Sequence, residues 1–234
     1  MKRIFACIFS ALALPALAQD TAKVADSLQP KKSIQHHLRV GADLVKVTRS
    51  FLEDNYQGWE LVGDVRLTKN LYAAVELGNE EKYTEEDRSH FTTKGSYVKL
   101  GVDYNVYENW LDMNNQIYIG GRYGFSTFSQ DLHQYKIYTT HPFFPNDGQW
   151  IPSDVSHSSL NASWIEAVGG VKAEVLKHLY LGFSCRIHYL VHDKKPDNFE
   201  NHYIPGYQRK WDNPWGVSFN YTLTYQIPLF TSKW

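Results

Sequence analysis

The stretch LYLGFSCRIHYLV, residues 179–191, decides the fold that we predict for this chain. Its odd positions, from Leu179 to Val191, are apolar or aromatic, while its even positions include Gly182, Ser184 and Arg186. Because successive side chains of a β-strand point to opposite faces, this strand has one apolar and one polar face. Seven other stretches repeat the alternation, within residues 36–49, 58–67, 71–82, 98–106, 116–128, 165–175 and 215–227. The sequence therefore predicts an all-β protein with eight strands.

The polar faces of these predicted strands carry acidic and basic side chains in similar numbers. Such a face suits the inside of a narrow closed barrel, where opposite charges pair while the apolar face contacts lipid. We therefore predict an eight-stranded antiparallel transmembrane up-and-down β-barrel whose lumen is filled by side chains. The predicted lumen residues are Arg39, Asp43, Asp64, Arg66, Glu76, Lys99, Asp103, Arg122, Glu166, Lys172 and Arg186. A soluble barrel of the lipocalin type is the alternative, and it would place the same charges in water.

The first 18 residues have the pattern of a secretory signal peptide. Lys2 and Arg3 precede an apolar run that is too short to span a bilayer, and Ala16 and Ala18 are the small residues expected before a cleavage site. The segment that follows is polar and has no period, which is typical of flexible chain. We expect a signal peptide at residues 1–18, a flexible periplasmic segment at 19–35 and the barrel at 36–234.

The lengths of the connections predict the orientation of the barrel. With the N-terminus in the periplasm, the second, fourth and sixth connections should be short turns and the others longer outward loops. Short turns are predicted near residues 68–70, 109–114 and 176–178, and long connections at 129–160 and 193–213. This pattern predicts an integral protein of the outer membrane of a Gram-negative bacterium, with both termini in the periplasm.

Composition argues against several classes of partner and cofactor. Without Lys2 and Arg3 the chain has 22 basic and 25 acidic residues, so nucleic acid is not an expected partner. Cys185 is the only cysteine outside the predicted signal peptide, and its apolar face predicts a packing role rather than a nucleophile. The ten histidines are scattered without the spacing of metal ligands, so no cofactor is expected.

Residues that could catalyse a reaction do not form a complete set. His157 and Ser159 resemble part of the His-x-Ser element of the barrels that remove acyl chains from lipid A. However, Glu166 and Glu174 have the opposite parity, so they would lie on the other face of the strand and could not orient the histidine. We therefore expect no enzymatic activity, and we expect paired charges rather than an ion-conducting path in the lumen.

The predicted outward loops are rich in aromatic residues and proline. Proline restricts the backbone, and aromatic side chains held on restricted loops are typical of protein–protein contact sites. The candidate docking residues are Tyr135, Tyr138, Phe143, Phe144, Trp150, Tyr203, Tyr207 and Trp211. The alternative is that these aromatic residues pack against one another as a lid over the barrel.

Three strand segments resemble a known family. Residues 37–43 (HLRVGAD), 56–65 and 97–104 are similar to segments of small outer-membrane proteins of Bacteroidota, the DUF6048 type. The resemblance covers the whole mature chain and consists of strand patterns, without catalytic signatures. It implies an outer-membrane location and brings no known activity.

Together these observations predict a non-enzymatic barrel in contact with outer-membrane lipid. Its expected partners are a larger outer-membrane protein or surface lipoproteins, bound through the aromatic loops and the lipid-facing side. The candidate role is that of a subunit in an outer-membrane protein assembly or surface-lipoprotein complex. The alternatives are a lipid-modifying enzyme, a narrow channel and a surface adhesin.

Overall fold

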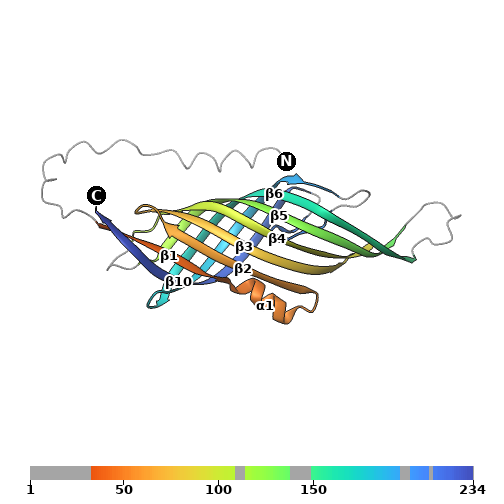
Figure 1. Ribbon diagram of the computed structural model, residues 1–234, viewed down its shortest axis with the longest axis horizontal. Coiled ribbons are helices and arrows are strands. Elements are labelled where there is room, and N and C mark those ends of the chain that lie inside the picture. The colour runs from red at the N-terminus through yellow and green to blue at the C-terminus, as the bar shows by residue number, and fades with distance from the viewer. Residues whose placement is uncertain (1–32, 109–113, 138–148, 196–200, 211–212, 234) are drawn as a thin grey trace, which may run out of the picture. The chain divides into compact units, whose positions relative to one another are not determined.

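The computed structural model describes residues 33–108, 114–137, 149–195, 201–210 and 213–233. In this part, eight long strands form a closed antiparallel barrel with the neighbour order β1-β10-β7-β6-β5-β4-β3-β2 (Figure 1). The predicted all-β, eight-stranded up-and-down barrel is confirmed. The strands are β1 (Ser33–Asp43), β2 (Tyr56–Arg66), β3 (Leu71–Glu85), β4 (Ser89–Asn105), β5 (Gln116–Lys136), β6 (Trp150–Leu176), β7 (Leu179–Asp193) and β10 (Trp215–Lys233). The predicted signal peptide and most of the predicted flexible segment lie outside the described residues.

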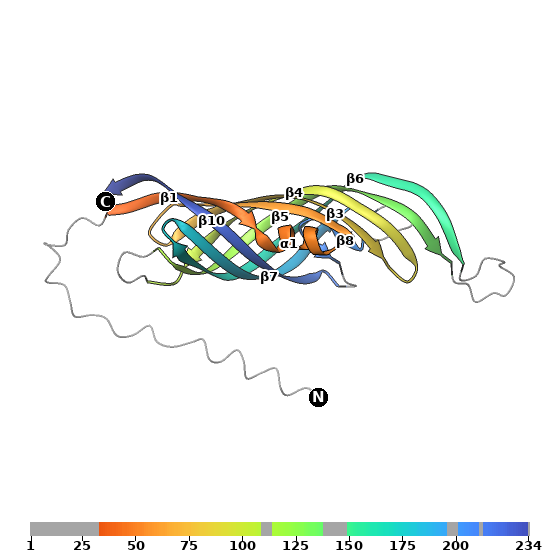
Figure 2. The same cartoon turned by 90° about the horizontal axis from the view of Figure 1, so that it is seen from below.

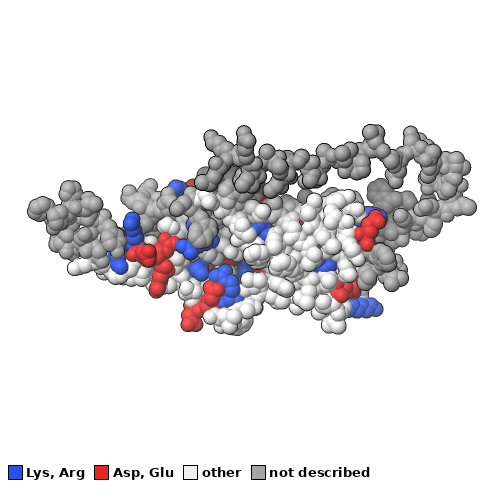
Figure 3. Space-filling model, turned by 180° about the vertical axis from the view of Figure 1, so that it is seen from behind, with Lys and Arg blue, Asp and Glu red and all other residues white. Residues whose placement is uncertain are grey.

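The alternation of the sequence separates the two faces of the barrel wall. Charged side chains such as Glu76 and Arg186 are buried inside, whereas Val40, Leu100 and Ile119 on the outer face are between 43 % and 59 % exposed. Figure 3 shows one side of the molecule, where acidic and basic side chains gather toward two ends and leave a band with few charges between them. A water-soluble lipocalin-type barrel would bury its apolar face, so that alternative does not fit.

Strands β5 and β6 continue well beyond the ends predicted from the sequence. They pair as far as Lys136 and Trp150, so most of the predicted connection at 129–160 is strand. Bulges between Phe128 and Gln130, and again after Leu132, shift the register. Because a bulge inserts one residue into one strand, it reverses the parity of the side chains and breaks the period-two pattern. Strands β3 and β4 also extend to within a short turn at residues 86–88, although the predicted strands end at residue 82 and begin at residue 98.

The first predicted strand, at 36–49, is wrong beyond Asp43 because the chain there forms a helix. Helix α1 (Leu44–Leu52) is capped by Asp43, whose carboxylate accepts a hydrogen bond from the Val45 amide at 2.9 Å. This cap satisfies one of the amides that the first helical turn leaves unpaired. The strand also begins earlier than predicted, at Ser33 rather than His36. Among the described residues, no helix has the length and apolar character needed to span a bilayer.

The barrel has a short wall and a raised wall (Figures 1 and 2). β1 and β2 have 11 residues each and are joined through α1, whereas β4, β5 and β6 have 17, 21 and 27 residues. The start of β2 belongs to a row of paired residues that runs across the wall, Tyr56, Lys82, Thr93, Gln130 and His157. We call the strand residues beyond this row, 83–85, 89–92, 131–136 and 150–156, the raised wall.

The connection between β7 and β10 contains a small hairpin. Its two strands, β8 (Tyr203–Ile204) and β9 (Gln208–Arg209), pair only with each other. All residues from 203 to 207 are buried, although they belong to a connection that was predicted to be an outward loop. The hairpin therefore folds back into the barrel.

Candidate functional site

Ten of the eleven predicted lumen charges lie inside the barrel. They are at most 9 % exposed, and they are Arg39, Asp43, Asp64, Glu76, Lys99, Asp103, Arg122, Glu166, Lys172 and Arg186. Arg66 is placed differently from the prediction. It is the last residue of β2, and its guanidinium donates hydrogen bonds to the carbonyl oxygens of Thr68 and Lys69 at 3.2 and 2.8 Å. Because its strand ends there, Arg66 binds the turn at the end of the lumen, and its guanidinium lies 5.8 Å from the centroid of the buried Tyr72 ring.

Glu76, on β3, lies at the centre of the buried charges. Arg186 donates two hydrogen bonds to its carboxylate, at 2.5 and 3.0 Å, and Arg122 donates one at 3.3 Å. The Nζ atom of Lys99 lies 3.6 Å from Glu76 and 3.2 Å from Glu166. These five residues come from the inward positions of five successive strands, β3 to β7, and we call them the charged zone. Each charge is paired, so loss of one would leave buried charges without partners.

Further ion pairs extend the charged zone and fill the barrel. Asp64 accepts hydrogen bonds from Arg39 and from Lys172, both at 2.7 Å. Arg122 also binds Asp103 through two hydrogen bonds of 2.8 and 2.9 Å. A cavity of about 20 Å³ lies among these side chains, which is room for a single water molecule. Bidentate pairs of this kind fix both partners in place.

Lys46, on α1, was not predicted as a lumen residue, yet it is 3 % exposed. Its ammonium forms an ion pair with Glu80 and lies 3.4 Å from Glu60. In a continuing strand, Lys46 would share the outward parity of Val40. The helix instead turns it toward the lumen. The signal that could have revealed this is Asp43, a preferred N-cap residue, directly before the helix.

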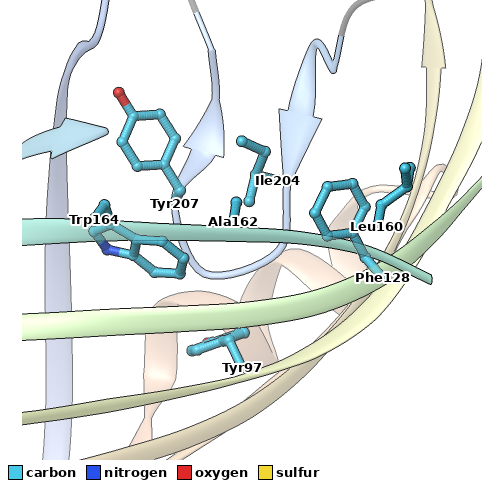
Figure 4. Close-up of a cluster of buried hydrophobic side chains, with 7 residues drawn as sticks. All are labelled: Tyr97, Phe128, Leu160, Ala162, Trp164, Ile204 and Tyr207. Atoms are coloured by element: carbon cyan, nitrogen blue, oxygen red, sulfur yellow. The ribbon is translucent and has the colours of Figure 1, made fainter. Parts of the chain in front are cut away.

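Besides the charged side chains, the interior contains a group of buried aromatic and apolar side chains (Figure 4). One buried cluster, which we call the aromatic zone, consists of Tyr97, Phe128, Leu160, Ala162, Trp164, Ile204 and Tyr207. The hairpin supplies Ile204 and Tyr207, and the wall supplies the rest. The rings of Trp164 and Tyr207 meet edge to face with centroids 5.8 Å apart, a favoured geometry for aromatic pairs. The hairpin is therefore held by packing as in a soluble protein core.

Tyr203 and Gly206 join the hairpin to the buried charges. The Tyr203 hydroxyl donates a hydrogen bond to Glu80 at 2.6 Å, and the Gly206 amide donates to the same oxygen at 3.2 Å. Burial, followed by the neighbouring Glu80 carboxylate, raises the pKa of Tyr203 well above its usual range, so the hydroxyl keeps its proton. Gly206 has a φ of +83°, and a Cβ atom there would lie 2.5 Å from the Tyr97 ring. Both facts require glycine.

For two of the predicted docking residues, the prediction of an outward position is wrong. Tyr203 and Tyr207 are 4 % and 2 % exposed because the hairpin carries them into the barrel, and there they pack as the lid alternative describes. Tyr135 is half-buried beside a second inner cluster of Tyr56, Phe91, Leu132 and Tyr203. Trp150 is 36 % exposed. Tyr138, Phe143, Phe144 and Trp211 lie outside the described residues.

A serine, a histidine and a glutamate meet on the inner wall. The Nε2 atom of His188 lies 2.7 Å from Ser218 Oγ, and its Nδ1 atom lies 3.2 Å from Glu166. These are the distances of a catalytic triad. However, the Tyr207 ring covers His188 with centroids 5.5 Å apart, and all three residues are at most 6 % exposed. A substrate would have to displace the hairpin, so the arrangement fits the buried network better than a hydrolytic site.

The outer face of the raised wall carries a group of aromatic and imidazole side chains, which we call the wall cluster: Tyr83, His90, His133, Gln134 and Trp150. The His90 Nδ1 atom lies 3.2 Å from the Tyr83 hydroxyl and 2.9 Å from the Gln134 amide. Trp150 packs on His90 with ring centroids 4.2 Å apart, and the rings of Tyr83 and His133 are 5.8 Å apart. Within the described chain, no group of three or more metal-ligating side chains is arranged to hold a metal ion.

A family model described as "Domain of unknown function (DUF6048)" matches residues 1–232 of this chain. No curated protein matches it. Among solved structures, the chain is similar to Neisserial surface protein A, with 12% identity, a TM-score of 0.42, and coverage of 87% of this chain and 99% of that one. It is also similar to Ail, the attachment invasion locus protein of Yersinia pestis, with 10% identity, a TM-score of 0.39, and coverage of 82% and 98%.

Proposed function

Because this chain belongs to the DUF6048 family, whose function is unknown, we propose its role from its own geometry. The protein is a non-enzymatic barrel of the outer membrane that docks another protein of the cell envelope through its raised wall. The observation that carries this proposal is the extra length of β4, β5 and β6, with 17, 21 and 27 residues. A tilted strand crosses a bilayer with about 9–11 residues, so the remainder stands outside it.

The membrane location is supported by the distribution of polarity and by the turns. The outer face is apolar in a continuous band, and the charges are paired inside, which is the pattern of a barrel in lipid. The short turns after Arg66 and after Leu176 lie at one end, and α1 and the raised wall lie at the other. Outer-membrane barrels have short periplasmic turns and long external connections. We therefore place both termini in the periplasm and the raised wall outside the cell.

The docking role is supported by the wall cluster. Its side chains are held by contacts between strands, so little side-chain freedom is lost when a partner binds. Tyrosine and tryptophan are also frequent among the residues that dominate protein–protein binding energy. The ammonium of Lys136 lies 4.0 Å from the Trp150 ring, which adds a positive charge beside the cluster. The partner that fits is an outer-membrane protein or surface lipoprotein that offers aromatic and acidic groups.

Photocrosslinking in living cells tests this proposal. The photoreactive residue p-benzoylphenylalanine replaces Tyr83 or Trp150 in the wall cluster, and Phe219 on the outer face of β10 serves as the control position. We expect one defined envelope protein to be crosslinked from both wall positions and not from Phe219. We also expect His90→Ala to weaken both crosslinks, because His90 orders its neighbours. A protein adduct from Phe219 alone, or none from either wall position, would overturn the raised wall as a docking site for an envelope protein.

A surface adhesin is the second candidate, and the same raised wall favours it. An adhesin binds a partner outside the cell, so crosslinking in a pure culture would yield no envelope protein from Tyr83 or Trp150. Attachment to a surface would then be lost when Trp150→Ala is introduced. Retained attachment in that variant would exclude the wall cluster as the adhesive site.

A further inference from the structure

The polar side of helix α1 is fixed against the barrel. Lys46 forms an ion pair with Glu80 inside the lumen mouth. One turn later, the Ser50 hydroxyl lies 2.9 Å from the carbonyl oxygen of Gly58 and accepts a hydrogen bond from the Gly58 amide at 2.8 Å. Residues four apart lie on the same side of a helix, so these contacts share one face. This face cannot turn to the solvent without breaking a buried ion pair.

The opposite side of α1 carries no charge and ends in two exposed apolar side chains. It includes Leu44 and Val47, which are half-buried, and the exposed Thr48, and it ends in Phe51 and Leu52. Phe51 is 85 % exposed and Leu52 is 78 % exposed, more than any other large apolar side chain of the described residues. Leaving two such side chains in water forgoes the free energy that large apolar side chains gain when they are buried in an apolar environment. A surface helix of a soluble protein buries its apolar side and exposes its polar side, whereas α1 does the opposite.

The position of α1 in the wall indicates which environment the apolar side meets. The helix follows β1 and precedes β2, and both strands have the length that crosses a bilayer. On these strands, Val40 is 43 % exposed and Trp59 is 50 % exposed as parts of the apolar band. At the end of the helix, Arg49 donates two hydrogen bonds to Glu53, at 2.8 and 2.9 Å. The apolar side therefore continues the band up to its polar edge.

We propose that α1 lies in the outer leaflet of the membrane, with Phe51 and Leu52 inserted among lipid acyl chains. The inference rests on the proposed membrane location and adds a lipid-contacting helix to it. We assign lipid hydrocarbon to the exposed side of α1 because this side carries no charge and continues the apolar band of β1 and β2. The polar side chains Lys46 and Ser50 of the helix are directed to the barrel instead. In this arrangement α1 completes the apolar surface where the wall is shortest, as amphipathic helices do at membrane interfaces.

Spin labels at single cysteines test this assignment. The chain without residues 1–18 receives Cys185→Ser, which leaves no other cysteine, and then Phe51→Cys or Leu52→Cys. Val40→Cys is the control in the apolar band, and Asp54→Cys is the control just beyond the helix. After reconstitution into phospholipid vesicles, paramagnetic relaxation measures collision with oxygen, which concentrates in hydrocarbon, and with a water-soluble nickel chelate. We expect labels at 51 and 52 to give ratios of oxygen to nickel collision close to that of Val40 and several-fold above that of Asp54.

The controls separate failure of this inference from failure of the membrane location. If labels at 51 and 52 behave like the one at Asp54 while Val40 still reports hydrocarbon, the lipid assignment of α1 is overturned. The face would then belong to a protein partner, and the barrel would remain a membrane protein. If Val40 also collides mainly with the nickel chelate, the membrane location fails as well. Phe51 and Leu52 are labelled separately, so one variant suffices if the other does not fold.

Discussion

The interior of the barrel is built in two ways. In the charged zone, five strands each contribute one inward side chain, and Glu76 is bound by Arg122 and Arg186 at its centre. In the aromatic zone, the wall is not sufficient, and the hairpin supplies Ile204 and Tyr207 from a connection. The comparison shows that strand parity identifies the interior side chains only where the strands alone fill the lumen. In the aromatic zone, the hairpin between β7 and β10 completes the packing.

Glu76→Ala should have the largest effect, because it breaks the centre of the charged zone. The substitution leaves Arg186 and Arg122 without a carboxylate that both use, so we expect the free energy of unfolding to fall by about 3–5 kcal/mol. Urea titration in vesicles, followed by tryptophan fluorescence, measures this loss. Glu81→Ala is the matched control, since Glu81 lies on the same strand and makes an exposed ion pair with Lys94. Equal stability of the two variants would contradict a central role for Glu76.

The charged zone could be predicted from the sequence because the period of a strand is two. Once one apolar face is recognised, residues such as Glu76 and Arg186 must share the other face, even though they are 110 positions apart. The identity of each partner was not predictable, since it depends on the register between strands. At strand ends the rule does not give the partner, as Arg66 shows, because a side chain next to a turn binds the carbonyl oxygens of that turn.

The aromatic zone and the raised wall were not predictable for two different reasons. Residues 203–207 have no period, because a hairpin inside a barrel is held by packing and by a glycine with positive φ. In β6, each bulge near Phe128 and Leu132 adds one residue and interrupts the alternation, and in β5 residues 129–131 are polar on both faces, so these long strands resemble loops. The wall cluster was therefore missed except for Trp150. Helix α1 was missed because Asp43 was read as a strand residue and not as a cap.

Gly206→Ala should have the next largest effect and should act on the aromatic zone. The new Cβ atom meets the Tyr97 ring, and the positive φ disfavours alanine, so we expect a cost of about 2–4 kcal/mol. The expected result is detachment of the hairpin, seen as loss of the near-ultraviolet dichroism of Trp164 and as cleavage within residues 201–210 by added protease. Gly169→Ala on β6 is the control, because nothing lies within 4 Å of its new methyl group. An unchanged spectrum in Gly206→Ala would show that the hairpin tolerates a side chain there.

Tyr203→Phe tests the link between the two zones. It removes the hydroxyl that donates to Glu80, so we expect a loss of about 1.5–3 kcal/mol at neutral pH. The pKa of Tyr203 is raised in the folded barrel, so the stability that it contributes is present below the ordinary tyrosine pKa of about 10 and is lost as the pH rises above it. The difference in stability between the wild type and the variant should therefore shrink at alkaline pH. Tyr123→Phe, half-exposed on the outer face of β5, should show no such difference.

Ser218→Ala should have the smallest effect on stability. It also tests whether the aromatic zone prevents the group of Ser218, His188 and Glu166 from reacting with a substrate. Loss of the contact with His188 removes one hydrogen bond, about 1 kcal/mol or less. Because Tyr207 covers His188, a fluorophosphonate probe should not label the folded wild type at Ser218, and deletion of the gene should leave lipid A mass spectra unchanged. Labelling that Ser218→Ala abolishes would instead establish a reactive serine. If Tyr207→Ala alone admitted the probe, the hairpin would be the barrier that separates a structural network from a catalytic one.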